Sequence, residues 1–155
     1  MKISGIVYDS VVDGEGIRNT IFVSGCKHHC KGCQNPQTWD FNYGYEFTEE
    51  LQNKFIEKCK RNLLLDGITI SGGDPIYNFN DLIPFIKKYK KENPTHTIWL
   101  YTGFKFEEIK DNPVIDLVDV VVDGEYVEEL RDITLKFKGS SNQRIIKLEK
   151  NNYEK

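Results

Sequence analysis

Short runs of β-branched and aromatic residues alternate along this chain with longer segments that have helical periodicity. The four strongest extended runs lie at 17–24, 67–71, 97–101 and 117–122. Helical segments are expected after three of these runs, at about 48–63, 80–92 and 105–110. In the first helix, Thr48 is the expected N-cap, and a buried stripe is expected from Leu51, Phe55, Cys59 and Leu63. The alternation predicts an α/β fold with a parallel sheet and right-handed crossovers.

Weaker patterns complete the expected order of elements. An edge strand is plausible within 3–12, and late strands are predicted at 135–138 and 144–148. The aromatic segment 34–47, which contains Pro36 and Gly44, is interpreted as an ordered loop.

A length of 155 residues suits one domain, expected at 1–148, with a frayed polar tail at 149–155. The chain is too short for an eight-unit barrel, which takes about 200 residues or more. The sequence therefore predicts a compact partial (β/α) barrel or an open, mostly parallel sheet.

The charge distribution narrows the class of partner. A net charge of −3 and a pI near 5.7 give no basic stripe, so no nucleic-acid partner is expected. No apolar run approaches the ~18–20 residues of a membrane span, and the N-terminus lacks a signal-peptide pattern. We expect a cytoplasmic protein without a membrane partner, in a compartment where clustered cysteines bind metals or do redox chemistry.

Three of the four cysteines fall in one short segment with the spacing C-x3-C-x2-C, at Cys26, Cys30 and Cys33. Three thiolates on one loop can converge on an iron–sulfur cluster or a zinc ion, and either centre takes about four ligands. The fourth position can be left open for a substrate. For zinc, it can instead be filled by His28, His29 or Cys59.

The other unusual residues also follow predicted strands. In a parallel sheet, ligands bind where the carboxyl ends of the strands meet. These ends carry Gly25–Cys26, Gly72–Pro75, Thr102–Gly103 and Asp123–Gly124. The sequence therefore predicts one site along one edge of the sheet.

A C-x3-C-x2-C loop after the first strong strand of a β/α chain resembles the radical S-adenosylmethionine enzymes. A closer similarity is to the activating proteins of anaerobic (class III) ribonucleoside-triphosphate reductase. The segments that carry it are Asp13–Arg18, Phe22–Cys26, Gly32–Cys33, Thr38–Trp39, Ser71–Pro75, Val122–Gly124 and Gly139–Gln143. They span nearly the whole chain, so the resemblance implies that the sheet is of the radical S-adenosylmethionine type.

The resemblance also implies the cofactors and the residues that bind them. The implied ligands of one 4Fe–4S cluster are Cys26, Cys30 and Cys33. S-adenosylmethionine is expected at Gly72, Gly73, Asp74 and Pro75, with its adenine near Gly32, Cys33 and Gln34. No catalytic side chain beyond the cluster and the cofactor is implied, since the chemistry belongs largely to these groups.

The implied reaction is reductive cleavage of S-adenosylmethionine to a 5′-deoxyadenosyl radical. The radical then removes a hydrogen atom from a glycine on the large subunit of the anaerobic reductase. Reduced flavodoxin or ferredoxin is the implied electron donor. Two alternatives stay open: activation of another glycyl-radical enzyme such as pyruvate formate-lyase, or a noncatalytic zinc or iron–sulfur binding module.

Several residues have two interpretations at this stage. Asp123 can hold a cation or cap the segment 125–127, and the cap is favoured slightly. Arg18 and Arg144 are candidate partners for the cofactor carboxylate. The aromatic side chains of 39–45 can dock a partner, or they can cover the cofactor face or the core. Exposed loop positions are expected for His28 and His29, and Cys59 is expected in the core.

Overall fold

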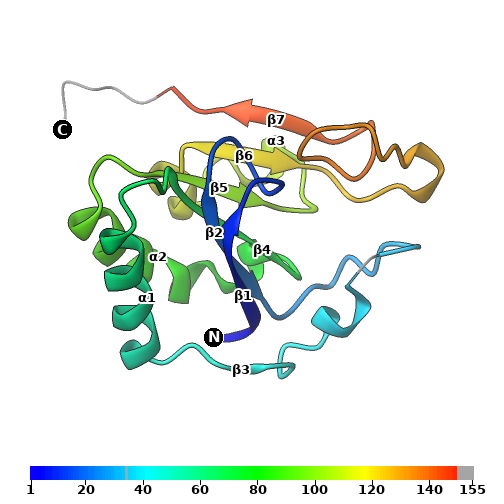
Figure 1. Cartoon of the computed structure of the whole chain (residues 1–155). Helices are drawn as coiled ribbons and strands as arrows, with labels where there is room; N and C mark the ends of the chain where they lie inside the picture. Colours follow the sequence, from blue (N-terminus) through cyan, green and yellow to red (C-terminus); the bar gives the residue numbers. More distant parts are fainter. Residues whose placement is uncertain (34, 150–155) are drawn as a thin grey trace.

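A computed structural model describes residues 1–33 and 35–149 of the chain (Figure 1). Its strands form one seven-stranded sheet in the order β3-β1-β2-β4-β5-β6-β7. Their bounds are Lys2–Ser10 (β1), Arg18–Val23 (β2), Tyr45–Glu46 (β3), Gly67–Gly72 (β4), Thr97–Tyr101 (β5), Val120–Asp123 (β6) and Arg144–Lys147 (β7). The central strands β2, β4, β5 and β6 run parallel, and β1, β3 and β7 pair antiparallel at the sides. The predicted α/β fold with a parallel sheet is confirmed for this central part.

Helices connect the parallel strands. They are α1 (Glu49–Arg61), α2 (Phe79–Glu92) and the single turn α3 (Phe106–Ile109). Short 3-10 helices lie at Pro36–Trp39, Pro75–Asn78, Pro113–Leu117 and Glu128–Leu130. Proline starts three of these four turns, because it fits the first helical position and needs no backbone hydrogen bond there.

The first helix begins where the sequence predicts and ends earlier. The Thr48 hydroxyl accepts a hydrogen bond from the N–H of Leu51 at 3.2 Å, which confirms the N-cap. The backbone leaves the helical region at Asn62, and the Asn62 amide binds Asp9. Leu63 therefore lies outside the helix with 94% of its surface exposed, and Leu51 in the first turn is exposed as well, so the predicted buried stripe is wrong at both ends and holds for Phe55 and Cys59.

The core lies between α1, α2 and one face of the sheet. From the helices, it contains Phe55, Ile56, Cys59, Leu82, Phe85, Ile86 and Tyr89. The facing strand residues include Ile21, Ile68, Ile70, Ile98, Leu100 and Val121. Each such side chain contributes about 1.5–3 kcal/mol on burial, so this layer holds the parallel strands in place. The expected core position of Cys59 is confirmed.

The hydrophobic cluster on the opposite face of the sheet is smaller, and loops cover it. Trp99 is buried there against Phe137, with the two rings 5.3 Å apart. Phe137 has a left-handed backbone with φ 64°, which an extended strand does not accommodate. The predicted strand at 135–138 is therefore wrong, and the segment forms a loop across the sheet.

The parallel register brings the carboxyl ends of β2, β4, β5 and β6 to one edge of the sheet (Figure 1). The cysteine loop leaves from β2 at this edge, on the right of the view. Among the described residues, no helix is long and apolar enough to cross a membrane.

Candidate functional site at the carboxyl edge of the sheet

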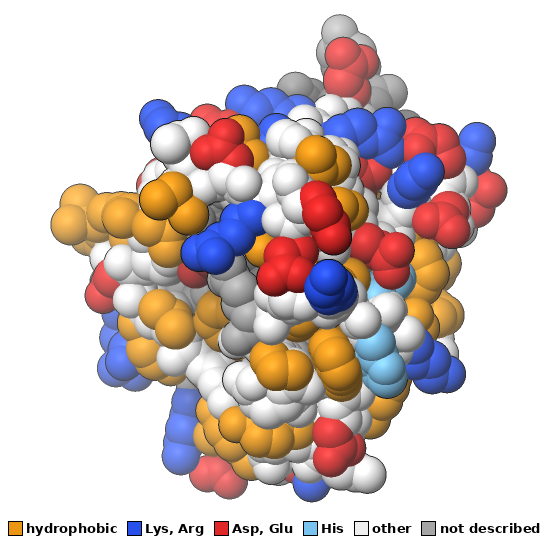
Figure 2. All heavy atoms as spheres, turned by 90° about the vertical axis from the view of Figure 1, so that its right-hand side faces the viewer, with side chains coloured by type: hydrophobic (Ala, Val, Ile, Leu, Met, Phe, Trp, Pro, Cys, Tyr) orange, Lys and Arg blue, Asp and Glu red, His pale blue; other side chains and the backbone are white. Residues whose placement is uncertain are grey.

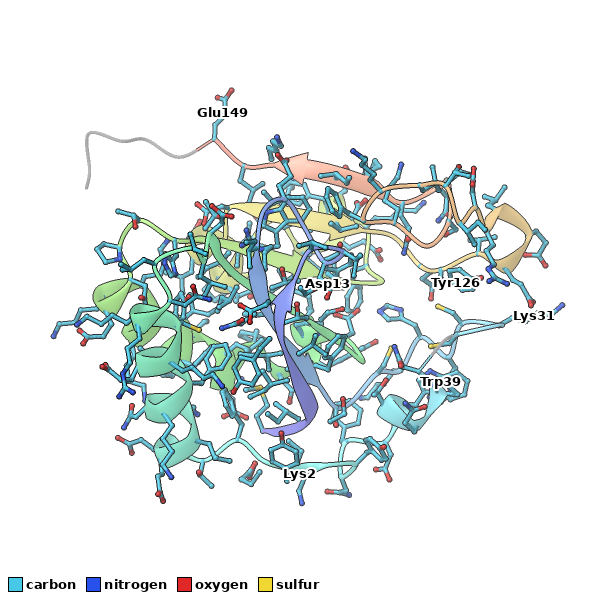
Figure 3. The ribbon with its side chains drawn as sticks, viewed as in Figure 1. Lys2, Asp13, Lys31, Trp39, Tyr126 and Glu149 are labelled. Atoms are coloured by element: carbon cyan, nitrogen blue, oxygen red, sulfur yellow. The ribbon has the colours of Figure 1, made fainter. Side chains whose placement is uncertain are left out.

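The cysteine segment 26–33 forms a loop directly after β2. We call it the cysteine loop. Cys26 is buried, Cys30 and Cys33 are half-buried, and all three thiols are free. Left-handed backbone at Gly25, His29 and Gly32 turns the chain on either side of the cysteines. In Figure 3 the loop carries Lys31 to the same end of the molecule as Tyr126, which follows β6.

The donor set suits an iron–sulfur cluster, because three thiols from one short loop supply soft ligands of the kind such clusters bind. Within residues 1–33 and 35–149, no three metal-ligating side chains are already gathered closely enough to hold a metal ion. Each cysteine of a 4Fe–4S cluster binds a different iron, so the three thiols need not converge on a single ion.

The protein environment holds the Cys26 thiol protonated before any metal binds. Burial raises the pKa of the Cys26 thiol to about 11. Hydrogen bonds from the backbone N–H groups of His28 and His29 act in the opposite direction, but their effect is smaller. Burial also raises the pKa of Cys30, which the N–H of Tyr126 lowers in turn. Metal ligation requires thiolates, so incorporation of a cluster releases these protons.

The predicted segment Gly72–Pro75 packs directly against the start of the cysteine loop. The N–H of Gly73 donates to the Val23 carbonyl at 2.8 Å, and the N–H of Asp74 donates to the Gly25 carbonyl at 2.8 Å. Gly72 has φ 110° and lies so close to the backbone of Val23 that no side chain fits. The two glycines thus permit a backbone contact between the end of β4 and the loop.

The Asp74 side chain is fully buried beneath this contact. Its carboxylate accepts hydrogen bonds from the Ile76 N–H (3.0 Å), the Thr102 hydroxyl (2.9 Å) and the Gly103 N–H (2.8 Å). Pro75, next in the chain, is also buried and starts a 3-10 helix. Asp74 therefore joins the ends of β4 and β5, and its carboxylate does not face solvent.

His28 completes the shell around Asp74. Its Nε2 atom lies 2.7 Å from Oδ2 of Asp74, and its Nδ1 atom lies 3.1 Å from Oε2 of Glu125. The hydrogen bond with Asp74 raises the pKa of His28, while burial acts in the opposite direction. Only 11% of the His28 side chain is exposed, so the expectation of an exposed loop histidine is wrong for His28 and holds for His29.

The second half of the loop lies against the chain that follows β6. Gly32 has φ 76°, a backbone conformation that favours glycine, and a Cβ added there would stand 2.8 Å from the carboxyl carbon of Glu128. The N–H of Cys33 donates to the Cys30 carbonyl at 3.1 Å. The predicted adenine contact at Gln34 lies outside the described residues.

Asp123 ends β6 and is buried. Its carboxylate accepts a hydrogen bond from the Phe106 N–H at 2.7 Å and binds the Arg144 guanidinium, which also lies 2.7 Å from Glu107. Asp123 therefore caps α3, and the favoured cap at 125–127 is wrong. The pKa of Arg144 is raised chiefly by its hydrogen bond with Asp123 and secondly by its hydrogen bond with Glu107, so the guanidinium stays charged.

Arg18 lies at the opposite edge of the sheet from the cysteine loop. It opens β2, and its side chain is buried with bonds to the Thr69 hydroxyl (3.0 Å) and the carbonyls of Ile68 (2.8 Å) and Thr97 (2.5 Å). The guanidinium also lies 5.7 Å from the Trp99 ring. These contacts make Arg18 part of the core and separate it from the candidate site.

A cavity of about 640 Å³ opens beside the cysteine loop. Its lining includes His28, Tyr77 and Phe104 together with Lys105, Arg144 and several carboxylates. Figure 2 faces this edge, where acidic and basic side chains lie side by side near the pale-blue histidines. The volume of the cavity suits a small-molecule site.

The aromatic segment 39–45 supports the cysteine loop from below. Trp39 stacks on His29 with the ring centroids 4.4 Å apart. Phe41 packs tightly over Gly25, and the Tyr43 carbonyl accepts a hydrogen bond from the Ser24 hydroxyl at 2.6 Å. Trp39 and Phe41 thus lie against the cysteine loop and the residue that precedes it. Phe41, Tyr43 and Tyr45 also remain partly exposed.

The family model of the 4Fe-4S single cluster domain matches residues 12–146 of the chain. This match covers the cysteine loop and all four parallel strands, so the protein is of the iron–sulfur class.

Curated relatives define the family more narrowly. The chain is 39% identical over 140 residues to the anaerobic ribonucleoside-triphosphate reductase-activating protein of Haemophilus influenzae, a match that covers 87% of this chain and 90% of that protein. Identity to the protein of the same name from Salmonella typhimurium is 41% over 138 residues, covering 86% and 90%. The identity to the protein of the same name from Enterobacteria phage T4 is 38% over 136 residues, which covers 86% of each chain. The chain belongs to the family of anaerobic ribonucleoside-triphosphate reductase-activating proteins.

Proposed function

We propose that this protein generates a glycyl radical on the large subunit of an anaerobic ribonucleoside-triphosphate reductase. One structural observation carries the proposal: at one edge of the sheet, the Gly72–Pro75 segment is hydrogen-bonded to Gly25, which precedes the cysteine loop, and to His28 within it. The names of the relatives support the choice of partner. The sheet would then be an open partial barrel of the radical S-adenosylmethionine type.

Cys26, Cys30 and Cys33 would hold a 4Fe–4S cluster through three thiolates, leaving one iron open to S-adenosylmethionine. When bound, the reduced cluster and the cofactor together supply the 5′-deoxyadenosyl radical that removes a hydrogen atom from glycine. The protein's own work is to bind, orient and shield these groups.

The segment Gly72–Pro75 would bind the methionyl end of the cofactor through its backbone. The Asp74 carboxylate is enclosed by donors, so the carbonyl oxygens of Gly72 and Gly73 are the acceptors for an ammonium group. Lys105 and Arg144 in the adjacent cavity offer cations for the cofactor carboxylate. Gly32, Cys33 and Gln34 stay our proposed contacts for the adenine.

The compartment we propose is the cytoplasm, because clustered thiols stay reduced in a reducing compartment. The electron donor we propose is reduced flavodoxin or ferredoxin, on the basis of the family resemblance alone. Activation of pyruvate formate-lyase is the alternative reaction, and the relatives' names favour the reductase over it.

The test is anaerobic reconstitution with iron and sulfide, followed by reduction and assay for 5′-deoxyadenosine from S-adenosylmethionine. We expect product with the large subunit present. A protein that takes up zinc or iron but releases no 5′-deoxyadenosine, even with the partner, would instead be a noncatalytic binding module.

A further inference from the structure

We propose that His28 is a positioning residue that fastens the cysteine loop to the ends of β4 and β6, through Asp74 and Glu125. The inference rests on the proposed function to the extent that the loop must hold a cluster. It assigns a role to a side chain between the cluster ligands that is not itself a ligand.

Both ring nitrogens of His28 face carboxylates that come from different strands. Nε2 lies 2.7 Å from the buried Asp74, and Nδ1 lies 3.1 Å from the half-exposed Glu125. Asp74 is itself held by Thr102 and Gly103, so it is a rigid anchor for the ring. With a partner at each nitrogen, the imidazole is fixed both in position and in rotation about its last bond.

The surroundings of the ring are shaped to receive it. The Phe104 ring packs edge-on at a centroid distance of 4.6 Å, and the Tyr77 ring lies at 5.7 Å. At Gly103, an added Cβ would stand only 2.6 Å from Cδ2 of His28. Glycine at the end of β5 therefore leaves the space that the ring fills.

The position of His28 in the loop makes this attachment relevant to the cluster. His28 stands between Cys26 and Cys30, so its anchored side chain limits where these two thiols can move. Groups that orient metal ligands in this way typically change metal affinity by about 10–100-fold when they are removed. The expected effect of losing the ring is weaker retention of the cluster.

The experiment measures how fast the reconstituted protein releases iron to a chelator under anaerobic conditions. We expect His28→Ala to release iron about 10-fold faster than the parent. His28→Gln, which keeps one side-chain donor, should fall between the two. The matched control is Lys31→Ala, which removes a side chain from the same loop that is 83% exposed, and it should release iron at the parent rate.

Gly103→Ala tests the same attachment without altering the cysteine loop. The new methyl group should displace the ring and speed iron release as His28→Ala does. Because the clash needs the ring, the double variant His28→Ala/Gly103→Ala should release iron no faster than His28→Ala alone. Additive effects in the double variant would contradict the proposal.

A spectroscopic readout separates positioning from a general loss of stability. The paramagnetic resonance spectrum of the reduced cluster should change on addition of S-adenosylmethionine in the parent and less in His28→Ala, with both spectra recorded at a temperature at which circular dichroism shows the two proteins to be folded. Parent-like iron release and spectra in His28→Ala would overturn the attachment role. A parent protein that binds no cluster would instead contradict the proposed function.

Discussion

Gly73 lies so close to the Gly25 carbonyl oxygen that an added Cβ would stand 2.6 Å from it, and 2.8 Å from the carbonyl oxygen of Thr38. Both neighbours are backbone atoms of the segments that frame the cysteine loop. The end of β4 and the start of the loop are therefore packed as one unit, and the packing depends on the absence of a side chain at this position.

Gly73→Ala should separate these two segments. Overpacking of this kind costs about 1–3 kcal/mol, and we expect a loss of that size in the free energy of unfolding together with a weaker affinity for S-adenosylmethionine. Chemical denaturation and ligand titration measure the two effects. The matched control is Gly5→Ala in β1, where an added Cβ meets no atom within 4 Å. Equal behaviour of both variants would contradict the close packing.

The four cysteines should divide into three ligands and one core residue. Cys30→Ala should abolish iron binding, because two thiolates cannot hold a 4Fe–4S cluster. Cys59→Ala should retain the cluster, since Cys59 is buried between the helices and the sheet and accepts a hydrogen bond from Asn19. We expect only a loss of about 1 kcal/mol in stability. Iron analysis after reconstitution distinguishes the two, and loss of iron in Cys59→Ala would refute this division.

Much of the fold could be predicted from local patterns. Periodic apolar residues predict α1 and α2, and β-branched runs predict the parallel strands. The structure contains each of these elements, since the predicted apolar faces pack against one another in the core. Leu63 fits the same four-residue period, yet the helix ends before it, because Asn62 leaves the helical region. The segment around Phe137 has strand-like composition, and only its packing on Trp99 shows that it turns instead.

The site could be predicted as far as strand ends define it. The double glycine and the cysteine loop meet because parallel strands share an edge. The contact between His28 and Glu125 joins residues 97 positions apart, and no local pattern indicates it. The partner of Asp123 is not readable from local patterns either. Its carboxylate binds the N–H of Phe106, which follows the neighbouring strand β5, and not the segment 125–127 that comes next in the chain.

Arg18 should contribute to stability and not to cofactor binding. Burial lowers the pKa of Arg18 to about 10, so it stays charged at neutral pH and depends on its surrounding oxygen acceptors. Arg18→Lys keeps a charge but loses the planar fork, and we expect a loss of about 2 kcal/mol in unfolding free energy. The dissociation constant for S-adenosylmethionine should equal that of the parent. A stable variant with weaker cofactor binding would contradict this assignment.

His96 should titrate below the usual range for histidine. Burial lowers its pKa, and its Nδ1 atom lies within hydrogen-bond distance of the Tyr89 hydroxyl, at 2.7 Å. The folded chain then binds fewer protons here than the unfolded chain, so this contribution to stability is present above about pH 6.5 and is lost as the pH falls toward the folded pKa. A nuclear magnetic resonance titration should give a His96 midpoint below about 6.5. A midpoint at or above that value would show that the ring is not desolvated.

We propose that a cluster held by the cysteine loop, together with S-adenosylmethionine, generates the radical that removes a hydrogen atom from a glycine of the reductase. The most direct measurement is electron paramagnetic resonance on the large subunit after anaerobic incubation with this protein, a reductant and S-adenosylmethionine. We predict a glycyl-radical signal on the reductase that is absent with the Cys30→Ala variant. No signal on the reductase, from a protein that carries its full cluster, would contradict the claim, as would a signal that forms only on another glycyl-radical enzyme.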